Sequence, residues 1–120
     1  MTITIYHNPG CSKSRKTLEL IESRGITPRI VHYLREPPDA ATLLRLANLL
    51  QQPLAQILRT SEAEYVAAGD AVPLDNEQRL ADWVKQHPRV LQRPIVVNER
   101  CHSAIIGRPP ENVFDILEND

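Results

Sequence analysis

The fold is decided near the N-terminus, where residues 2–15 read TITIYHNPGCSKSR. Alternating β-branched residues over Thr2–Tyr6 predict a short strand, and the turn residues 8–10 end it. A helix is expected over about residues 12–24, and a second strand over residues 29–34. Strand, helix and strand within about 35 residues form a βαβ unit. We therefore expect the two strands to be parallel, with a right-handed crossover.

Residues 38–88 are predicted to form a helical block. Asp39 is the expected N-cap of its first helix. Pro53 suits the first turn of another helix that runs through Leu58. Asp75 is expected to begin a longer amphipathic helix near the end of the block.

The last third of the chain returns to β structure. Strands are predicted over residues 94–98 and 103–107, and their short connection implies an antiparallel hairpin followed by a last helix. The element order β-α-β, helices, β-β-α predicts an α/β fold. At 120 residues we expect one domain over residues 1–120, with a helical insertion at about residues 38–88.

Composition narrows the functional class. The net charge of −1 argues against a nucleic-acid binder that works by bulk charge. No run approaches the roughly 18 apolar residues of a membrane span, and the N-terminus does not read as a secretory signal. Two cysteines, Cys11 and Cys101, cannot make a disulfide framework. We therefore expect a cytoplasmic protein that binds neither nucleic acid nor membrane.

Cys11 is the candidate nucleophile. It falls between a predicted strand and a predicted helix, where unpaired N–H groups and the helix dipole favour negative charge. Lys13, Arg15 and Lys16 crowd the first turn, where acidic residues would normally stabilise the helix. A thiol in this place should ionise more readily than a free cysteine. The alternative is that Cys11 is a small buried core residue.

Two neighbours could assist this thiol. Ser14 follows Cys11 by three residues and can donate a hydroxyl hydrogen bond to the thiolate. His7 precedes it by four residues and could pair with it when protonated. The alternatives are a first-turn hydroxyl for Ser14 and a capping role for His7. Ser14 also occupies the position that would complete a C-x-x-C motif, and no metal-ligand spacing is present, so neither dithiol exchange nor a metal site is expected.

Three arginines are candidates for binding an oxyanion. Arg59 ends a predicted helix, while Arg93 precedes one strand of the hairpin and Arg108 follows the other. An antiparallel pair returns the chain to its starting edge, so Arg93 and Arg108 should lie at the same end of the sheet. Guanidinium groups bind tetrahedral oxyanions in bidentate fashion, although each arginine could equally be a solvated surface residue. Cys101 falls in the hairpin turn at the other end, and we assign it no catalytic role.

The sequence resembles the glutaredoxin-linked arsenate reductase family over nearly its whole length and in the same order. The matching segments are Ile5–Pro9, Cys11, Ser14-Arg15, Thr17-Leu18, Tyr33-Leu34, Pro37-Pro38, Leu58-Arg59, His87-Pro88, Arg93–Val97 and Gly107–Pro109. The pair Ser12-Lys13 resembles the residues at this position in one branch of the family, whose members are named reductases only because of their similarity to the others. The resemblance implies a thioredoxin-like fold with a helical insertion and a cis peptide bond before Pro94.

The resemblance also implies roles for the candidate residues. Cys11 would attack arsenate, and His7 and Ser14 would keep it ionised. The substrate-binding residues would be Arg59, Arg93 and Arg108. Glutathione would serve as co-substrate and glutaredoxin as the reducing partner, with no bound metal or prosthetic group.

Two other functions stay open on the sequence. A monothiol oxidoreductase acting on glutathionylated proteins would need Cys11 but not three oxyanion arginines. A non-enzymatic redox regulator that binds RNA polymerase would share the fold. Its members typically carry C-x-x-C, and Ser14 argues against that kind of intramolecular switch.

Overall fold

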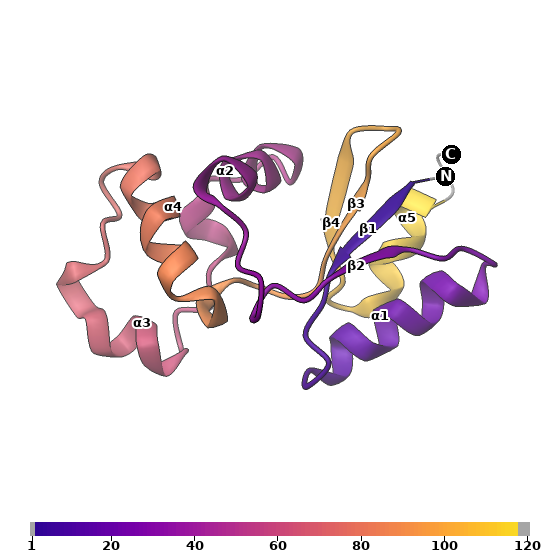
Figure 1. Ribbon diagram of the computed structural model, residues 1–120, viewed down its shortest axis with the longest axis horizontal. Coiled ribbons are helices and arrows are strands. Elements are labelled where there is room, and N and C mark those ends of the chain that lie inside the picture. The colour runs from indigo at the N-terminus through magenta and orange to yellow at the C-terminus, as the bar shows by residue number, and fades with distance from the viewer. Residues whose placement is uncertain (1, 118–120) are drawn as a thin grey trace. The chain divides into compact units, whose positions relative to one another are not determined.

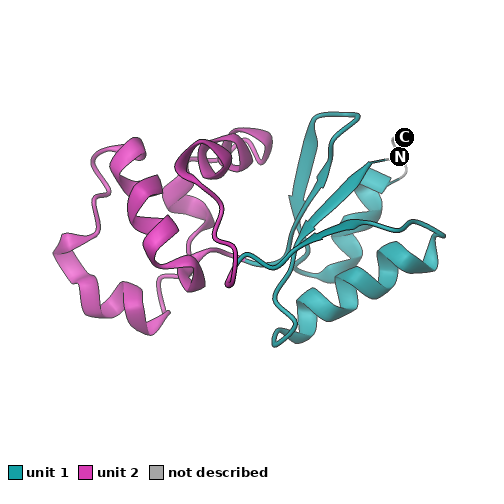
Figure 2. Ribbon diagram, viewed as in Figure 1, with its two compact units in different colours: residues 1–33, 93–120 teal, residues 34–92 magenta. Residues whose placement is uncertain are grey.

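The computed structural model describes residues 2–117 and divides the chain into two compact units. One unit contains the residues up to Tyr33 and those from Arg93 onward, and it is called the sheet unit here. The other contains residues 34–92 and is called the helical unit; Figure 2 colours the two separately. The helical insertion predicted over about residues 38–88 falls within the helical unit.

The sheet unit is built on four short strands. They are β1 (Ile3–Tyr6), β2 (Arg29–Val31), β3 (Ile95–Asn98) and β4 (Ser103–Ile106), in the spatial order β2-β1-β3-β4. β1 is parallel to β2 and antiparallel to β3, and β3 is antiparallel to β4. The predicted parallel βαβ pair and the predicted hairpin are both confirmed.

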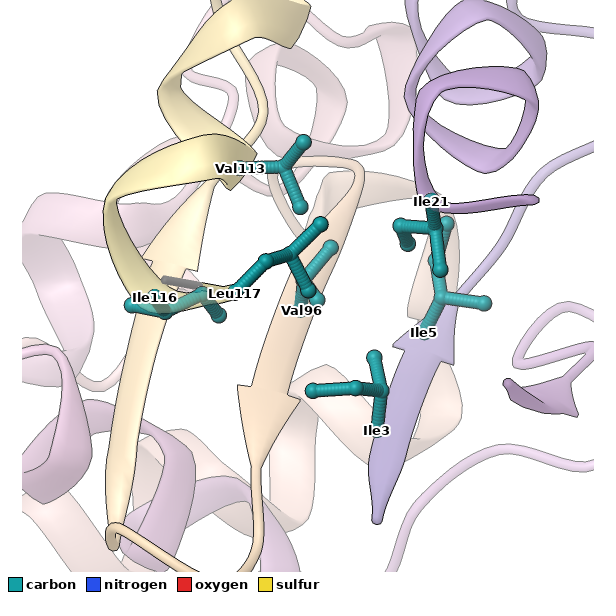
Figure 3. Close-up of a cluster of buried hydrophobic side chains, with 7 residues drawn as sticks. All are labelled: Ile3, Ile5, Ile21, Val96, Val113, Ile116 and Leu117. Carbon is teal, nitrogen blue, oxygen red and sulfur yellow. The ribbon is translucent and has the colours of Figure 1, made fainter. Parts of the chain in front are cut away.

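One face of this sheet is covered by helices (Figure 1). These are α1 (Ser12–Ser23), the 3₁₀ turn η4 (Pro110–Val113) and α5 (Phe114–Leu117). Their apolar side chains meet those of β1 and β3 in the cluster drawn in Figure 3: Ile3, Ile5, Ile21, Val96, Val113, Ile116 and Leu117. Each fully buried aliphatic side chain of this kind contributes about 1.5–3 kcal/mol. The cluster therefore fixes α1, and the residues at its start, against the sheet.

The helical unit contains three α-helices and three short 3₁₀ turns. In chain order they are α2 (Ala40–Leu49), η1 (Leu54–Ile57), α3 (Ala63–Ala68), η2 (Gly69–Ala71), α4 (Glu77–Gln86) and η3 (Pro88–Val90). α2 packs against α4, and the residues buried on the two helices include Leu43, Leu46, Leu80 and Val84.

The predicted helix starts in this unit are partly right. Asp39 caps α2 as expected, accepting the N–H of Thr42 at 2.8 Å. The cap of α4 is Asn76 and not Asp75, because the Asn76 side chain accepts the N–H of Arg79 at 3.0 Å. Pro53 precedes a 3₁₀ turn of four residues instead of an α-helix.

Candidate active site

One end of the sheet gathers residues from four segments of the chain, and it is called the site end below. β1 and the parallel β2 both finish there, followed by His7 and His32. The antiparallel β3 begins there after Arg93, and β4 finishes there before Arg108. α1 begins at the same end because only residues 7–11 separate it from β1. Strand direction alone thus brings His7 and Arg108, which are far apart in sequence, to one edge.

Cys11 occupies the N-cap position of α1. Its backbone is extended (φ −101°, ψ 123°), and its carbonyl accepts the first helical bond from the N–H of Arg15 at 3.0 Å. The Cys11 N–H donates to the carbonyl of Asn8 at 3.0 Å, which holds the preceding loop in a tight turn. Lys13 and Arg15 lie in the first turn of the helix. The half-buried thiol therefore stands at a helix start whose dipole and side chains both favour a negative charge.

The surroundings lower the pKa of the Cys11 thiol. Partial burial works against ionisation, but the main-chain N–H groups of Ser14 and Lys13 and the guanidinium of Arg93 favour the thiolate and outweigh it. This combination of a helix N-terminus and an adjacent cation is the environment that activates cysteine nucleophiles.

Ser14 is fully buried, and its hydroxyl forms hydrogen bonds with His7 and Asn8. The hydroxyl oxygen lies 2.6 Å from Nδ1 of His7 and accepts the N–H of Asn8 at 3.0 Å. The predicted hydroxyl bond to the thiolate is therefore replaced by a different arrangement. Ser14 acts on Cys11 through its main-chain N–H, while its side chain joins His7 to the start of α1.

His7 is buried, and its pKa lies below the ordinary imidazole value. Burial is the main cause, and the charges of His32 and Arg15 act in the same direction. The structure therefore favours the neutral form of the ring. The protonated form of His7 that would pair with the thiolate is therefore disfavoured, because burial and the neighbouring cations oppose a positive charge on the ring.

Arg93 and Arg108 lie at the same end of the sheet, as the hairpin predicted. Nη1 of Arg108 donates to the main-chain carbonyl of Arg93 at 3.0 Å. Each arginine precedes a cis peptide bond, to Pro94 and to Pro109. The first of these was predicted and is confirmed, and the second was not predicted. Of the two guanidinium groups, that of Arg93 is the one that acts on the Cys11 thiol.

Gly107 lets these parts approach one another closely. A Cβ atom at this position would lie 2.5 Å from Oγ1 of Thr17 on α1 and 2.8 Å from Cγ of Pro94. Only a residue without a side chain fits between α1 and the proline that follows Arg93. The N–H of Gly107 also donates to the carbonyl of Pro94 at 2.9 Å, which fixes the end of β4 beside the start of β3.

Arg59 belongs to the helical unit. It does not end a helix, as predicted, but lies in an extended segment two residues beyond η1. Leu58 forms an isolated antiparallel bridge with Leu91, and the N–H of Arg59 donates to the carbonyl of Val90 at 2.6 Å. The Arg59 side chain is one-quarter exposed, and its Nη1 lies 3.9 Å from the carboxylate of Glu62.

Cys101 is placed where the sequence predicted. It is exposed in the β3–β4 turn, where its N–H donates to Oδ1 of Asn98 at 3.2 Å. Asn98 pairs with Ile3 at the start of β1, whereas Cys11 follows the end of β1. The two cysteines therefore lie at opposite ends of the sheet.

His32 is a residue of the site end that the sequence analysis did not single out. Its ring lies against that of His7, with centroids 6.0 Å apart. The sequence could have predicted this neighbour, because His32 follows the second strand of the parallel βαβ unit as His7 follows the first. Within residues 2–117 no cluster of three or more metal-ligating side chains occurs, and none of the helices has the length and apolar character needed to cross a bilayer.

Comparisons with known proteins cover almost the whole chain. A family model described as "ArsC family" matches residues 6–116. The chain is 41% identical over 116 residues to the Escherichia coli (strain K12) protein named "Uncharacterized protein YfgD", covering 96% of each. It is 40% identical over 115 residues to an "Arsenate reductase" of the same strain, covering 96% of this chain and 80% of that one. A solved structure named "Arsenate reductase from Vibrio cholerae" is similar with a TM-score of 0.88 and 38% identity, covering 97% of this chain and 98% of that chain.

Proposed function

Because the chain belongs to the ArsC family, whose fold is thioredoxin-like, we propose that it reduces arsenate to arsenite with Cys11 as the nucleophile and glutathione and glutaredoxin as electron donors. The observation that carries the proposal is the lowered pKa of the Cys11 thiol at a helix start next to Arg93. A thiolate is the form of cysteine that can attack arsenic, and a site rich in N–H groups and cations suits an oxyanion.

Arg93, Arg108 and Arg59 are the proposed substrate-binding residues. Arg93 acts on the thiol, so an anion held by its guanidinium would be next to the nucleophile. Arg108 is tied to the Arg93 main chain and would bind the same anion from the end of β4. Arg59 is assigned by the family resemblance, and its side chain is partly exposed in the helical unit. Guanidinium forks match the geometry of arsenate oxygens and would spread the charge that develops during attack.

The proposed reaction has two stages. The Cys11 thiolate attacks arsenic(V), a sulfur–arsenic bond forms, and one arsenate oxygen leaves as water after taking up protons. Glutathione then adds, and glutaredoxin resolves the mixed adduct. In the net reaction arsenic gains two electrons and loses one oxygen as water, while two glutathione thiols become one disulfide. No bound metal or prosthetic group takes part.

The position of Cys101 supports an external thiol donor. Cys101 lies at the end of the sheet opposite Cys11, and Ser14 occupies the fourth position of what would be a C-x-x-C motif. A second thiol for reduction would therefore come from outside the chain. Glutathione in a reducing cytoplasm is the abundant small thiol that fits this requirement, and we propose the cytoplasm as the site of action.

A coupled steady-state assay tests this function. Arsenate, glutathione and glutaredoxin are supplied to the wild-type protein and to its Cys11→Ser and Cys101→Ser variants, and arsenite formation is measured. We expect turnover with the wild type and with Cys101→Ser, and none with Cys11→Ser. Omission of either glutathione or glutaredoxin should stop the reaction.

Full turnover by Cys11→Ser would overturn the mechanism. No arsenate turnover by the wild type, together with Cys11-dependent cleavage of glutathionylated protein, would favour the monothiol oxidoreductase instead.

A further inference from the structure

A second histidine is held beside His7 by the strand register. β1 and β2 are parallel with Tyr6 opposite Val31, so His7 and His32 are the residues that directly follow the two adjacent strands. The main-chain N–H of His7 donates to the carbonyl of Val31 at 2.9 Å. The two rings meet edge to face, with centroids 6.0 Å apart and planes inclined by 60°. The contact is therefore set by the sheet and not by a flexible loop.

The His32 ring is half-buried beside His7. Its Nδ1 atom is buried and has no hydrogen-bond partner within the described part of the chain. A side chain whose ring nitrogen has no partner within the protein does not owe its place to a hydrogen bond, so its ring contact with His7 is the interaction to consider. That neighbour, His7, is 5% exposed, and its ring meets the ring of His32 edge to face.

The charge state of His7 depends on a few surrounding groups. Those that act on its ring are His32 after β2 and Arg15 on α1, and both oppose its protonation. Arg15 is tied to the loop, since its Nη1 donates to the carbonyl of Pro9 at 2.8 Å. Cys11 and Arg93 are further ionisable groups at the site end. His32 opposes a positive charge on His7, and its ring is also one of the groups in contact with the His7 ring.

The charge state of His7 decides the direction of the hydrogen bond to Ser14. A neutral imidazole with its proton on Nε2 accepts the Ser14 hydroxyl proton at Nδ1, over the observed 2.6 Å. The same hydroxyl oxygen accepts the N–H of Asn8, so its orientation is fixed on both sides. A protonated His7 would donate at Nδ1 and release the Ser14 hydrogen. Ser14 would transmit this change, because its main-chain N–H acts on the Cys11 sulfur.

We propose that His32 is a positioning residue for Cys11, which keeps the imidazole of His7 neutral and thereby fixes the hydrogen bond from Ser14 to His7 at the first turn of α1. The inference deepens the proposed function, on which it rests for the role of Cys11 as nucleophile. His32 does not touch the sulfur in this scheme, and its effect passes through His7 and Ser14.

Nuclear magnetic resonance of the four histidines tests the proposal on the intact chain. The imidazole titrations are compared in the wild type, His32→Ala and His32→Phe, with His102→Asn as the matched control. His102 lies in the β3–β4 turn with a positive φ, which asparagine tolerates. His32→Ala removes both the ring contact and the ionisable group, whereas His32→Phe keeps an aromatic ring and removes the imidazole nitrogens.

The expected result is an upward shift of the His7 titration midpoint, larger in His32→Ala than in His32→Phe. The control should leave it unchanged. A second readout is the pH profile of Cys11 alkylation in a Cys101→Ser background. In this profile, the inflection caused by His7 should move to higher pH together with the His7 titration midpoint. A loss of stability alone would lower the rate of alkylation without moving this inflection.

An unchanged His7 midpoint in both His32 variants would overturn the inference, and the phenylalanine variant gives this answer even if the alanine variant does not fold. The proposed function fails by a different result, namely absence of arsenate turnover in the wild type. The two failures are therefore distinguishable.

Discussion

Replacing Gly107 by alanine should push α1 away from Pro94, the residue that precedes β3. The added methyl group would lie 2.5 Å from Oγ1 and 3.1 Å from Cγ2 of Thr17, and 2.8 Å from Cγ of Pro94. Ordinary contacts between such atoms are about 3.5–4.0 Å, so the overlap is close to 1 Å on two sides. Gly107 does not have a positive φ, and the cost is therefore steric and not conformational.

Neither neighbour can yield cheaply. Thr17 is fully buried, and its hydroxyl donates to the carbonyl of Lys13 at 2.8 Å. Pro94 has a rigid ring, and its carbonyl accepts the Gly107 N–H at 2.9 Å. Overpacking of this kind costs about 1–3 kcal/mol. For a chain of this length that corresponds to a fall in Tm of roughly 3–5 °C for each kcal/mol.

Urea unfolding followed by far-ultraviolet circular dichroism measures this cost. We expect Gly107→Ala to be less stable than the wild type, and Thr17→Ala to relieve part of the loss when the two are combined. A double-mutant cycle should give a coupling energy of about 1 kcal/mol. A Gly107→Ala protein as stable as the wild type, or strict additivity in the cycle, would refute the reasoning. Because Arg93 adjoins Pro94, the pKa of the Cys11 thiol should also rise in the single variant.

Three further predictions concern anion binding, the hairpin and pH. Arg93→Ala and Arg108→Ala should each weaken the protection of Cys11 from alkylation by arsenate or sulfate about 10-fold or more, and unchanged protection in both would favour a protein-disulfide substrate. Asn98→Ala should lower the free energy of unfolding in urea by about 1–3 kcal/mol, because this buried side chain accepts two turn N–H groups and donates to the carbonyl of Ile116 at 2.9 Å; a loss below 0.5 kcal/mol would contradict this. Asp39 has its pKa lowered by the N–H of Thr42, so its stabilisation of α2 is complete above the ordinary aspartate pKa and is lost as pH falls through the lowered value. Asp39→Asn should flatten that part of the stability–pH curve, and an identical curve would count against the cap.

Much of the sheet unit could be predicted because local patterns and topology agree there. The β-branched run of β1, the glycine after α1 and the prolines before β3 and α5 mark element boundaries directly. Strand direction then placed Arg93 and Arg108 together and Cys101 at the far end, without any side-chain detail. The resemblance to the arsenate reductase family is likewise confirmed by the family model and by the solved structures.

The errors arose where the outcome depends on three-dimensional surroundings. The charge of His7 could not be predicted from its spacing to Cys11, because burial and the neighbouring His32 come from the fold. The spacing of Ser14 to Cys11 is compatible with a hydrogen bond from the hydroxyl to the sulfur. Only the structure shows that the hydroxyl oxygen lies 2.6 Å from Nδ1 of His7 instead. The N-cap of α4 moved by one residue, from Asp75 to Asn76, since both side chains can cap a helix.

The central claim is that the pKa of the Cys11 thiol lies below that of a free cysteine, so that more of the sulfur is thiolate at neutral pH. The most direct measurement is the rate of iodoacetamide alkylation against pH, followed by intact mass on the Cys101→Ser protein so that a single thiol reacts. The lowered pKa predicts fast alkylation at neutral pH, with an inflection clearly below that of a free cysteine, moving upward in Arg93→Ala. An inflection at the free-cysteine value, with the same position in Arg93→Ala, would contradict the account.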